Sequence, residues 1–441
     1  MRDSWAAHRG AAVVVVVAFV LACLSYAVVH LHPLVYDAMG YWRIAGAYEE
    51  GGWFIRYRTA DVRTYLYPTL LLGVSRVAGA LGVEAAQVLF AFQFSAHVVS
   101  SALLARVVWA GRPRMALAVF AALVWNPFVL PYLASSLTDA VALACFQAWV
   151  AAIVASRRPD GHALRWLGLA ALLAGTACVL RPAYVWLLAL TPLLASWWRA
   201  RAQSGGSSSG LRLVLALLLA VPPLLPQMAI NQALFKRPTP LPAGTLAGSQ
   251  VHWGIANLKY ATAPTEQGNP QMFYPNPFAP ADALQGDEGV GWYLEHPLRG
   301  AATLATKFVG AFDFDYVQPY VWEREPPLQW VWRGASLLWL LLGLRGAWLV
   351  AVRGVEAGRF GGRWPVPLVI AAWCAVTLPS AIELRFSLPM LSLFALLGAV
   401  ALDDARRRSV RGQLALCGLA VAGFAVLVPL ARFVSAQNSL V

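Results

Sequence analysis

The chain has 441 residues, of which 59% are hydrophobic and 12% are charged, and its formal net charge at pH 7 is +13. A soluble domain carries roughly a quarter charged residues, so this composition excludes an ordinary soluble protein and predicts a polytopic membrane protein. In a soluble protein the positive charge would suggest a nucleic-acid partner. Here we expect it to follow membrane topology, and no nucleic-acid partner is expected.

The apolar segments predict an all-α fold with about 11 transmembrane helices, each near the length that crosses the hydrocarbon layer. The first segment, 11–31, has no convincing signal-peptide cleavage site and leads into further spans, so we interpret it as a retained signal anchor. The predicted spans are 11–31, 85–108, 115–133, 137–156, 164–180, 182–198, 211–230, 329–352, 364–382, 386–402 and 412–431.

The segment 65–82, YLYPTLLLGVSRVAGALG, is apolar but carries Arg76 and several glycines. This pattern favours a juxtamembrane helix over a full crossing; if the segment does cross, every later span is inverted. With the segment outside the bilayer, the basic loops RVVWAGRPR, SRRPDGHALR and DDARRRSVRG fall on one side of the membrane. Their positive charge predicts that this side, with the N-terminus, is cytoplasmic.

Two segments on the predicted outer face, 33–64 and 231–328, are too long to be simple connections. Within the second, 292–312 has helical apolar spacing with Arg299 and Lys307, which predicts an amphipathic helix lying on the outer leaflet. The predicted organisation is a transmembrane core that includes the first outer loop, a periplasmic loop region and a C-terminal group of transmembrane helices: 1–230, 231–328 and 329–441.

Ionisable side chains recur at the outer ends of the predicted spans. Asp37 opens the first outer loop, Asp139 begins a span, and Arg181 and Arg385 lie in tight outer turns. Charges at the rim of a membrane are costly and usually face a polar cavity, so their shared depth predicts one outward-facing site. Arginine binds phosphate oxygens in a bidentate fork, and a nearby carboxylate can act as a general base. A lipid phosphate is the anion expected at this depth.

Further charged residues could join this site, and each candidate also has a simpler interpretation. Arg58 and Arg63 lie in RYRTADVRTYLYP of the first outer loop. The aspartates could cap helices, and the arginines could extend along the membrane interface. Glu383 lies two residues before Arg385 and could form a local ion pair, and His252 is a lone histidine for which a structural role is simpler. No metal or other cofactor is expected, because no cysteine pair or carboxylate cluster has metal-ligand spacing.

The order of these motifs carries a family resemblance. An apolar first span is followed by YDAMGYWRIAGAY and VRTYLYPTLLLG, then by SSLTDAVALACFQAW, GTACVLRPAYVWLL and AIELRFSLPM. This pattern resembles the GT-C superfamily of membrane glycosyltransferases, above all the branch with protein O-mannosyltransferases and lipid A aminoarabinose transferases. Two departures are that Ala38 follows Asp37, where family members often have a second acidic residue, and that no large C-terminal periplasmic domain follows the last spans. Acceptor recognition is therefore expected in 231–328.

The resemblance implies an inverting glycosyltransferase of the bacterial inner membrane, with its active site on the periplasmic face. It implies transfer of a monosaccharide from a polyprenyl-phosphate donor to a glycolipid, protein or glycan acceptor. The implied catalytic residues are Asp37, as general base, and Asp139. The implied donor-phosphate ligands are Arg58, Arg63, Arg181 and Arg385. Candidate substrate contacts are Tyr36, Tyr41, Tyr65, His252 and Glu383.

Two other functions stay open at the level of the sequence. A transporter or flippase of lipid-linked sugars would also place arginines near a lipid phosphate, but it should carry ionisable groups deep in its spans and broken helices near mid-membrane. An O-antigen-ligase-type transferase would also use a large outer loop, although the early aspartate motif argues against it. The clustering of charged groups at one predicted face favours the glycosyltransferase.

Overall fold

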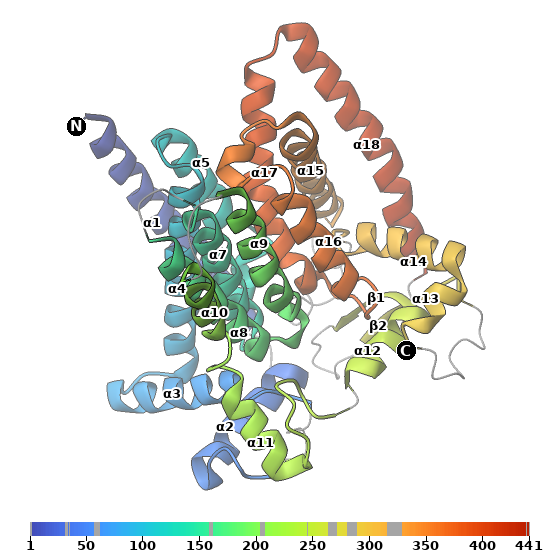
Figure 1. Cartoon of the computed structure of the whole chain (residues 1–441). Helices are drawn as coiled ribbons and strands as arrows, with labels where there is room; N and C mark the ends of the chain where they lie inside the picture. Colours follow the sequence, from blue (N-terminus) through green and yellow to red (C-terminus); the bar gives the residue numbers. More distant parts are fainter. Residues whose placement is uncertain are drawn as a thin grey trace. The chain divides into compact units, whose positions relative to one another are not determined.

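The computed structural model describes most of the chain, and it is predominantly helical (Figure 1). The described part holds 18 α-helices and one small three-stranded sheet, so the predicted all-α class is confirmed apart from that sheet. The chain forms two compact units, unit 1 (Met1–Gly244 with Gly358–Gly361) and unit 2 (Thr245–Ala357 with Gly362–Val441). The described residues are 2–30, 34, 36–56, 62–157, 162–202, 208–244, 246–262, 271–279, 289–314, 329–437 and 439–440.

Six of the described helices are long and apolar enough to cross a membrane, which makes this an integral membrane protein. Five shorter apolar helices of 10–17 residues accompany them. The six long segments are Arg9–Ala27, Ala85–Val108, Ala163–Leu180, Gln329–Arg353, Leu384–Arg406 and Val410–Ala436.

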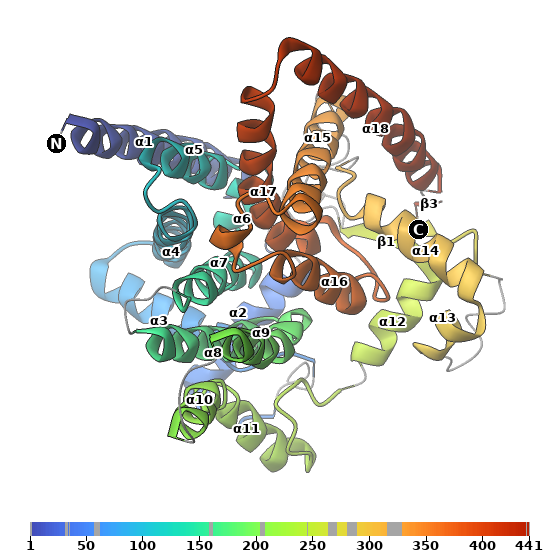
Figure 2. The same cartoon turned by 45° about the horizontal axis from the view of Figure 1, so that its top comes forward.

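Unit 1 is a helical bundle in which α7 packs against both α4 and α8 (Figure 2). Small residues on these helices are buried and let the backbones approach closely, as at Gly175, where an added Cβ would meet the backbone of Ala220. The elements of unit 1 are α1 (Arg2–His30), α2 (Tyr36–Gly51), α3 (Leu66–Leu81), α4 (Ala85–Val108), α5 (Pro113–Val124), α6 (Leu130–Leu133), α7 (Asp139–Ala155), α8 (Ala163–Leu180), α9 (Trp186–Ala202), α10 (Ser208–Leu218) and α11 (Leu225–Phe235).

Two predicted spans are wrong as continuous helices. The helix predicted over 115–133 ends at Val124, shortly before Pro127, and continues only as the four-residue α6. The helix predicted over 211–230 is broken between α10 and α11, around Pro222–Pro223. Proline lacks the backbone N–H that a helix interior needs and clashes with the preceding turn, which accounts for the break. By contrast, the helix predicted over 65–82 is present as α3 and ends at Gly82, whose φ of 67° glycine adopts readily.

Unit 2 contains the sheet and the remaining helices. Strands β1, β2 and β3 pair antiparallel in that order, with Tyr260 opposite Phe273 and Met272 opposite Leu440. The strands contribute a buried hydrophobic cluster that includes Leu258, Met272 and Tyr274. The elements of unit 2 are α12 (Leu246–Ala256), β1 (Asn257–Thr262), β2 (Gln271–Pro275), α13 (Gly291–Glu295), α14 (Pro297–Gly310), α15 (Gln329–Trp348), α16 (Pro365–Thr377), α17 (Leu388–Arg406), α18 (Val410–Ala436) and β3 (Ser439–Leu440).

The predicted amphipathic helix over 292–312 is present in two pieces, α13 and α14, which meet at Pro297. Lys307 is fully buried, whereas Arg299 is exposed, and Leu294 and Leu298 are 80% and 86% exposed. The helical part of the prediction is thus confirmed, and the location on the outer leaflet stays a prediction. The exposed leucines suit a helix that presents an apolar side to lipid.

Candidate functional site

The first candidate base, Asp37, lies in the first turn of α2 and forms an ion pair with Arg63, which lies shortly before α3. The Arg63 Nη2 atom donates to Asp37 Oδ1 at 2.9 Å, and 30% of the Asp37 side chain remains exposed. The Arg63 guanidinium also lies 4.4 Å from the centre of the Tyr41 ring, one helical turn after Asp37. The structure thus brings together a predicted base, a predicted phosphate ligand and a predicted substrate contact.

Two features of this corner hold the Arg63 guanidinium in place. An added Cβ at Gly40 would lie 3.0 Å from both Nε and Nη2 of Arg63, so the missing side chain makes room for the guanidinium. Burial by itself lowers the pKa of Arg63, but attraction to Asp37 and contact with Tyr41 outweigh that effect and raise it. Its buried Nε–H has no acceptor among the described residues. The guanidinium is therefore fixed, charged and able to donate to a further anion.

The second candidate carboxylate, Asp139, is the first residue of α7 and pairs with Arg181 at the end of α8. Arg181 Nη1 donates to Asp139 Oδ1, and the Asp139 side chain is 1% exposed. Gln93 of α4 donates to the carbonyls of Leu133 and Ser135 at 3.0 and 2.9 Å, which fixes the segment that leads into α7. Because a buried charge without its partner is costly, Asp139 and Arg181 are expected to form a permanent pair.

A hydrogen bond links the segments that carry these two ion pairs. The Thr64 hydroxyl donates to the carbonyl of Val179, so the residue next to Arg63 contacts α8 two residues before Arg181. Asp37, Arg63, Asp139 and Arg181 therefore come from four separate segments that converge within unit 1. The predicted convergence of Asp37, Asp139, Arg181 and Arg385 on one outward-facing site stays a prediction, because this contact links only segments of unit 1 and Arg385 belongs to unit 2.

Tyr65 forms part of the support beneath this site. Its backbone N–H donates to Gln227 Oε1 at 2.9 Å, its hydroxyl donates to the Pro223 carbonyl at 3.1 Å, and its side chain is buried. Burial also raises its pKa. Gln227 in turn donates to Asn231 Oδ1 at 2.9 Å, so α11 closes this end of unit 1. Sequence reasoning missed Gln227 and Asn231, although two amides in the apolar segment LPQMAIN could have drawn attention to them.

The remaining first-loop candidates differ in how far the structure defines them. Tyr36 begins α2 with φ of 39°, an unusual value for a residue other than glycine, and its side chain is exposed. Arg58 lies outside the described residues. Among the described residues no group of three or more histidine, cysteine, aspartate and glutamate side chains is placed to hold a metal ion.

Unit 2 holds the other predicted pair, Glu383 and Arg385, in the short 3₁₀ segment Leu384–Ser387 and the residue before it. Arg385 Nε donates to Glu383 Oε2, and both side chains are buried. The local ion pair that the sequence allowed is thus present. His252, on α12 of the same unit, is half-buried.

The segment before this pair is held from several sides. The Ser380 carbonyl accepts from Lys307 Nζ at 2.8 Å, the Ala381 N–H donates to the Gln250 carbonyl at 2.7 Å, and the Ile382 carbonyl accepts from Tyr260 N at 2.9 Å. Lys307 Nζ also donates to the Gly254 carbonyl at 2.6 Å. Burial lowers the pKa of Lys307 well below its ordinary value. Residues 380–382, which precede the Glu383–Arg385 pair, are therefore bonded to three separate elements, α14, α12 and β1.

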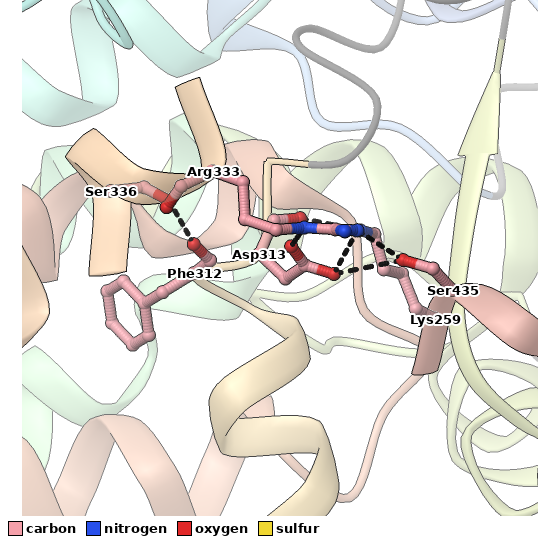
Figure 3. A network of polar contacts seen from close by, with 6 residues as sticks. All are labelled: Lys259, Phe312, Asp313, Arg333, Ser336 and Ser435. Carbon is pink, nitrogen blue, oxygen red and sulfur yellow. Dashed lines mark hydrogen bonds and ion pairs between the residues drawn. The ribbon is translucent and has the colours of Figure 1, made fainter. Parts of the chain in front are cut away.

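A second buried cluster in unit 2 surrounds Asp313 (Figure 3). Arg333 Nε and Nη2 lie 2.6 and 3.2 Å from the two carboxylate oxygens of Asp313, and the Ser435 hydroxyl lies 3.2 Å from Oδ2. Lys259 Nζ donates to the Asp313 carbonyl at 2.7 Å. Asp313 thus joins the sheet to α15 and α18 through Lys259, Arg333 and Ser435.

Comparison with family models and curated proteins found no relative of this chain. No family model matches the sequence, and no curated protein is significantly similar to it.

Proposed function

We propose that the chain is an inverting glycosyltransferase that takes a monosaccharide from a polyprenyl-phosphate donor. The observation that carries the proposal is the convergence of Asp37–Arg63 and Asp139–Arg181 in unit 1, with Thr64 bonded to Val179 between them. The partly exposed Asp37 carboxylate beside the Arg63 guanidinium supplies what such a reaction needs, a base for the acceptor and donors for the phosphate.

The donor phosphate binds Arg63 in this proposal. The guanidinium has five N–H donors, and Asp37 and the Tyr41 ring account for only part of its surface. A phosphate that reaches Arg63 competes with Asp37 for the same cation, so donor binding weakens the ion pair and makes the carboxylate more basic. Arg181 stays paired with buried Asp139 in this proposal, so it contributes N–H donors and not net charge.

The proposed reaction is a single displacement. The acceptor oxygen attacks the anomeric carbon and transfers its proton to an Asp37 carboxylate oxygen. The bond between the anomeric carbon and the phosphate oxygen breaks, and its electron pair stays on the phosphate. The arginines stabilise this growing negative charge. A phosphate is a good leaving group, so the reaction has less need of the second carboxylic acid that glycosidases use.

The wider arrangement is proposed with this reaction. It comprises a GT-C fold, about 11 crossings with the N-terminus in the cytoplasm, and an active site on the periplasmic face of a bacterial inner membrane. Arg385 and Arg58 are proposed as further phosphate ligands, and Tyr36, Tyr41, Tyr65, His252 and Glu383 as substrate contacts. The acceptor, a glycolipid, protein or glycan, is proposed to meet residues of 231–328.

A transporter of lipid-linked sugars is the second candidate, and two observations favour it. The predicted spans over 115–133 and 211–230 are broken, as transporter helices often are. In addition, α4 carries a buried polar row within its span, in which His97 contacts the Leu123 carbonyl and Ser100 donates to Gln147. Buried polar groups in a span mark a functional path by default.

One experiment separates the two candidates. The purified protein is reconstituted in liposomes with a panel of polyprenyl-phosphate sugars and an extract of envelope glycolipids and proteins. A glycosyltransferase releases polyprenyl phosphate and adds a sugar mass to an acceptor, whereas a transporter moves the intact donor between leaflets. Movement of intact donor without release of polyprenyl phosphate would replace the first proposal with the second.

A further inference from the structure

A cavity of about 640 Å³ lies between α1, α4 and α5 of unit 1. Its walls are apolar and contain many small residues, among them Ala12, Ala102, Ala105 and Ala116. Larger side chains at these positions would fill the space, so the cavity follows directly from the alanines. Its volume is typical of a site for a small organic ligand.

One strong charge borders this apolar cavity. Arg106 of α4 lines it, is exposed, and has neither an ion pair nor a hydrogen bond within the described part of the chain. No acidic residue occurs in the sequence between Glu84 and Asp139, which covers all of α4 and α5. The cavity therefore combines an apolar interior with a positively charged rim.

The position of the cavity along the helices gives its depth. It includes Trp109, Gly111 and Pro113, which lie in and around the basic loop that joins α4 to α5. This loop is one of those whose charge predicts a cytoplasmic location. The exposed residues Ala102 and Arg106 lie one turn apart on α4, so the cavity opens on the surface of that helix, where lipid surrounds a membrane protein.

We propose that this cavity binds one anionic glycerophospholipid of the inner leaflet. An acyl chain lies along the alanine-lined walls and fills them by van der Waals contact, and the phosphate binds the Arg106 guanidinium. Anionic lipids are the abundant phosphates of this leaflet, and each basic residue near its surface attracts them. The proposal is independent of the glycosyltransferase reaction.

The bound lipid has a structural consequence for α1. Only 17% of the apolar segment Arg9–Ala27 of α1 is buried within the protein. A hydrogen bond of 2.8 Å from Trp125 Nε1 to the Val14 carbonyl connects this helix to the residue that follows α5. A lipid between α1, α4 and α5 would fill the space beside this weakly packed helix.

Native mass spectrometry of the full chain in detergent tests the proposal. Dioleoyl phosphatidylglycerol and dioleoyl phosphatidylcholine are offered together to the wild type and to the variants Arg106→Ala, Arg106→Lys and Ala102→Leu. We expect one phosphatidylglycerol to be retained by the wild type, with an affinity at least about tenfold weaker in Arg106→Ala and Ala102→Leu. Arg106→Lys keeps the positive charge but loses the bidentate guanidinium, so its affinity for phosphatidylglycerol should lie between those of the wild type and Arg106→Ala.

The matched control is Arg76→Ala, which removes an equally exposed arginine from α3, away from the cavity, and should retain the lipid as the wild type does. Equal retention of phosphatidylcholine, or unchanged retention in both Arg106→Ala and Ala102→Leu, would overturn the proposal. A further arm adds undecaprenyl phosphate: if it displaces phosphatidylglycerol from the wild type but not from Ala102→Leu, the cavity binds the donor lipid and the proposal is wrong.

Discussion

Asp37 in unit 1 and Asp313 in unit 2 are both aspartates paired with an arginine, yet they differ in surroundings. Asp37 Oδ1 lies 2.9 Å from Arg63, with 30% of its side chain exposed. Asp313 is fully buried, and both of its oxygens are bound by Arg333, with Ser435 alongside (Figure 3). In the sequence the two look alike, since each stands next to aromatic residues near an apolar segment.

The difference shows what an ion pair must allow if it is to take part in catalysis. A partly exposed pair can exchange one partner for a substrate group at small cost, because water and other ions compensate for the lost contact. A buried pair cannot, because opening it leaves a charge in a medium that solvates it poorly. Asp37 is therefore the carboxylate suited to proton transfer, and Asp313 serves stability.

The largest expected effect is that of Asp37→Asn on sugar transfer. The amide cannot accept the acceptor's proton, so turnover should fall about 10³-fold, within the range for a lost general base. The apparent melting temperature should change little, because the side chain is partly exposed. Polyprenyl phosphate release and thermal unfolding, measured on the same preparation, check both parts. Turnover at the wild-type rate would remove Asp37 from the reaction.

The substitution Asp313→Asn should show the opposite pattern. It leaves the Arg333 guanidinium without its buried counter-charge, and we expect the free energy of unfolding to fall by about 3 kcal/mol. Turnover per folded molecule should stay near the wild-type value. The double variant Asp313→Asn/Arg333→Gln should recover part of the loss, because no unpaired charge remains. A loss of turnover without a loss of stability would contradict the distinction drawn between the two aspartates.

The substitution Gly40→Ala sharpens the comparison within unit 1. The added methyl group would push against the Arg63 guanidinium and move it relative to Asp37, so turnover should fall by about 10-fold to 10²-fold. Helix stability should not suffer, since alanine is the better helix former by about 1 kcal/mol. Gly46→Ala, on the same helix with nothing near the added carbon, is the control and should leave turnover unchanged. Equal turnover in the two variants would argue against precise placement of Arg63.

The smallest expected effect is a pH dependence of stability from Lys307 in unit 2. Its folded pKa is lowered by burial, so between the folded and unfolded values the unfolded chain binds more protons. The free energy of unfolding should therefore rise as the pH is raised through that window toward the ordinary lysine pKa. Below the folded pKa, the full destabilisation from the buried Lys307 charge should be present. Chemical unfolding of the wild type and of Lys307→Met at several pH values measures the difference. Lys236→Met, which removes an exposed lysine, should show no such trend.

Much of the helical framework could be predicted from apolar segment length, because a membrane span needs little besides length and composition. The breaks could also have been anticipated, since Pro127 and Pro222 stand inside the two spans that were predicted as continuous. The inward direction of the Lys307 side chain could not be predicted from the sequence. It depends on the carbonyls of Gly254 and Ser380, which come from segments more than 50 residues away in either direction.

The sequence indicated several residues of the candidate site, but it did not indicate which of them form ion pairs with one another. Asp37 and Arg181 stood out as charges at the ends of spans. Arg63 pairs with Asp37 across 26 residues, and Thr64 bonds to Val179, only because α3 packs against both α2 and α8. The role of Gly40 was hidden because a glycine in a helix gives no hint of which side chain occupies the space above it.

The C-terminal end of α12 has a consequence for the order in which unit 2 can assemble. Its last carbonyls are bound by residues made later: Gly254 by Lys307, and Ile255 and Ala256 by Asn276. Until those residues have left the ribosome, the helix end has only water or lipid headgroups as partners and should fray. A nascent chain stalled before Lys307 should therefore leave α12 open to protease, and one stalled beyond it should not.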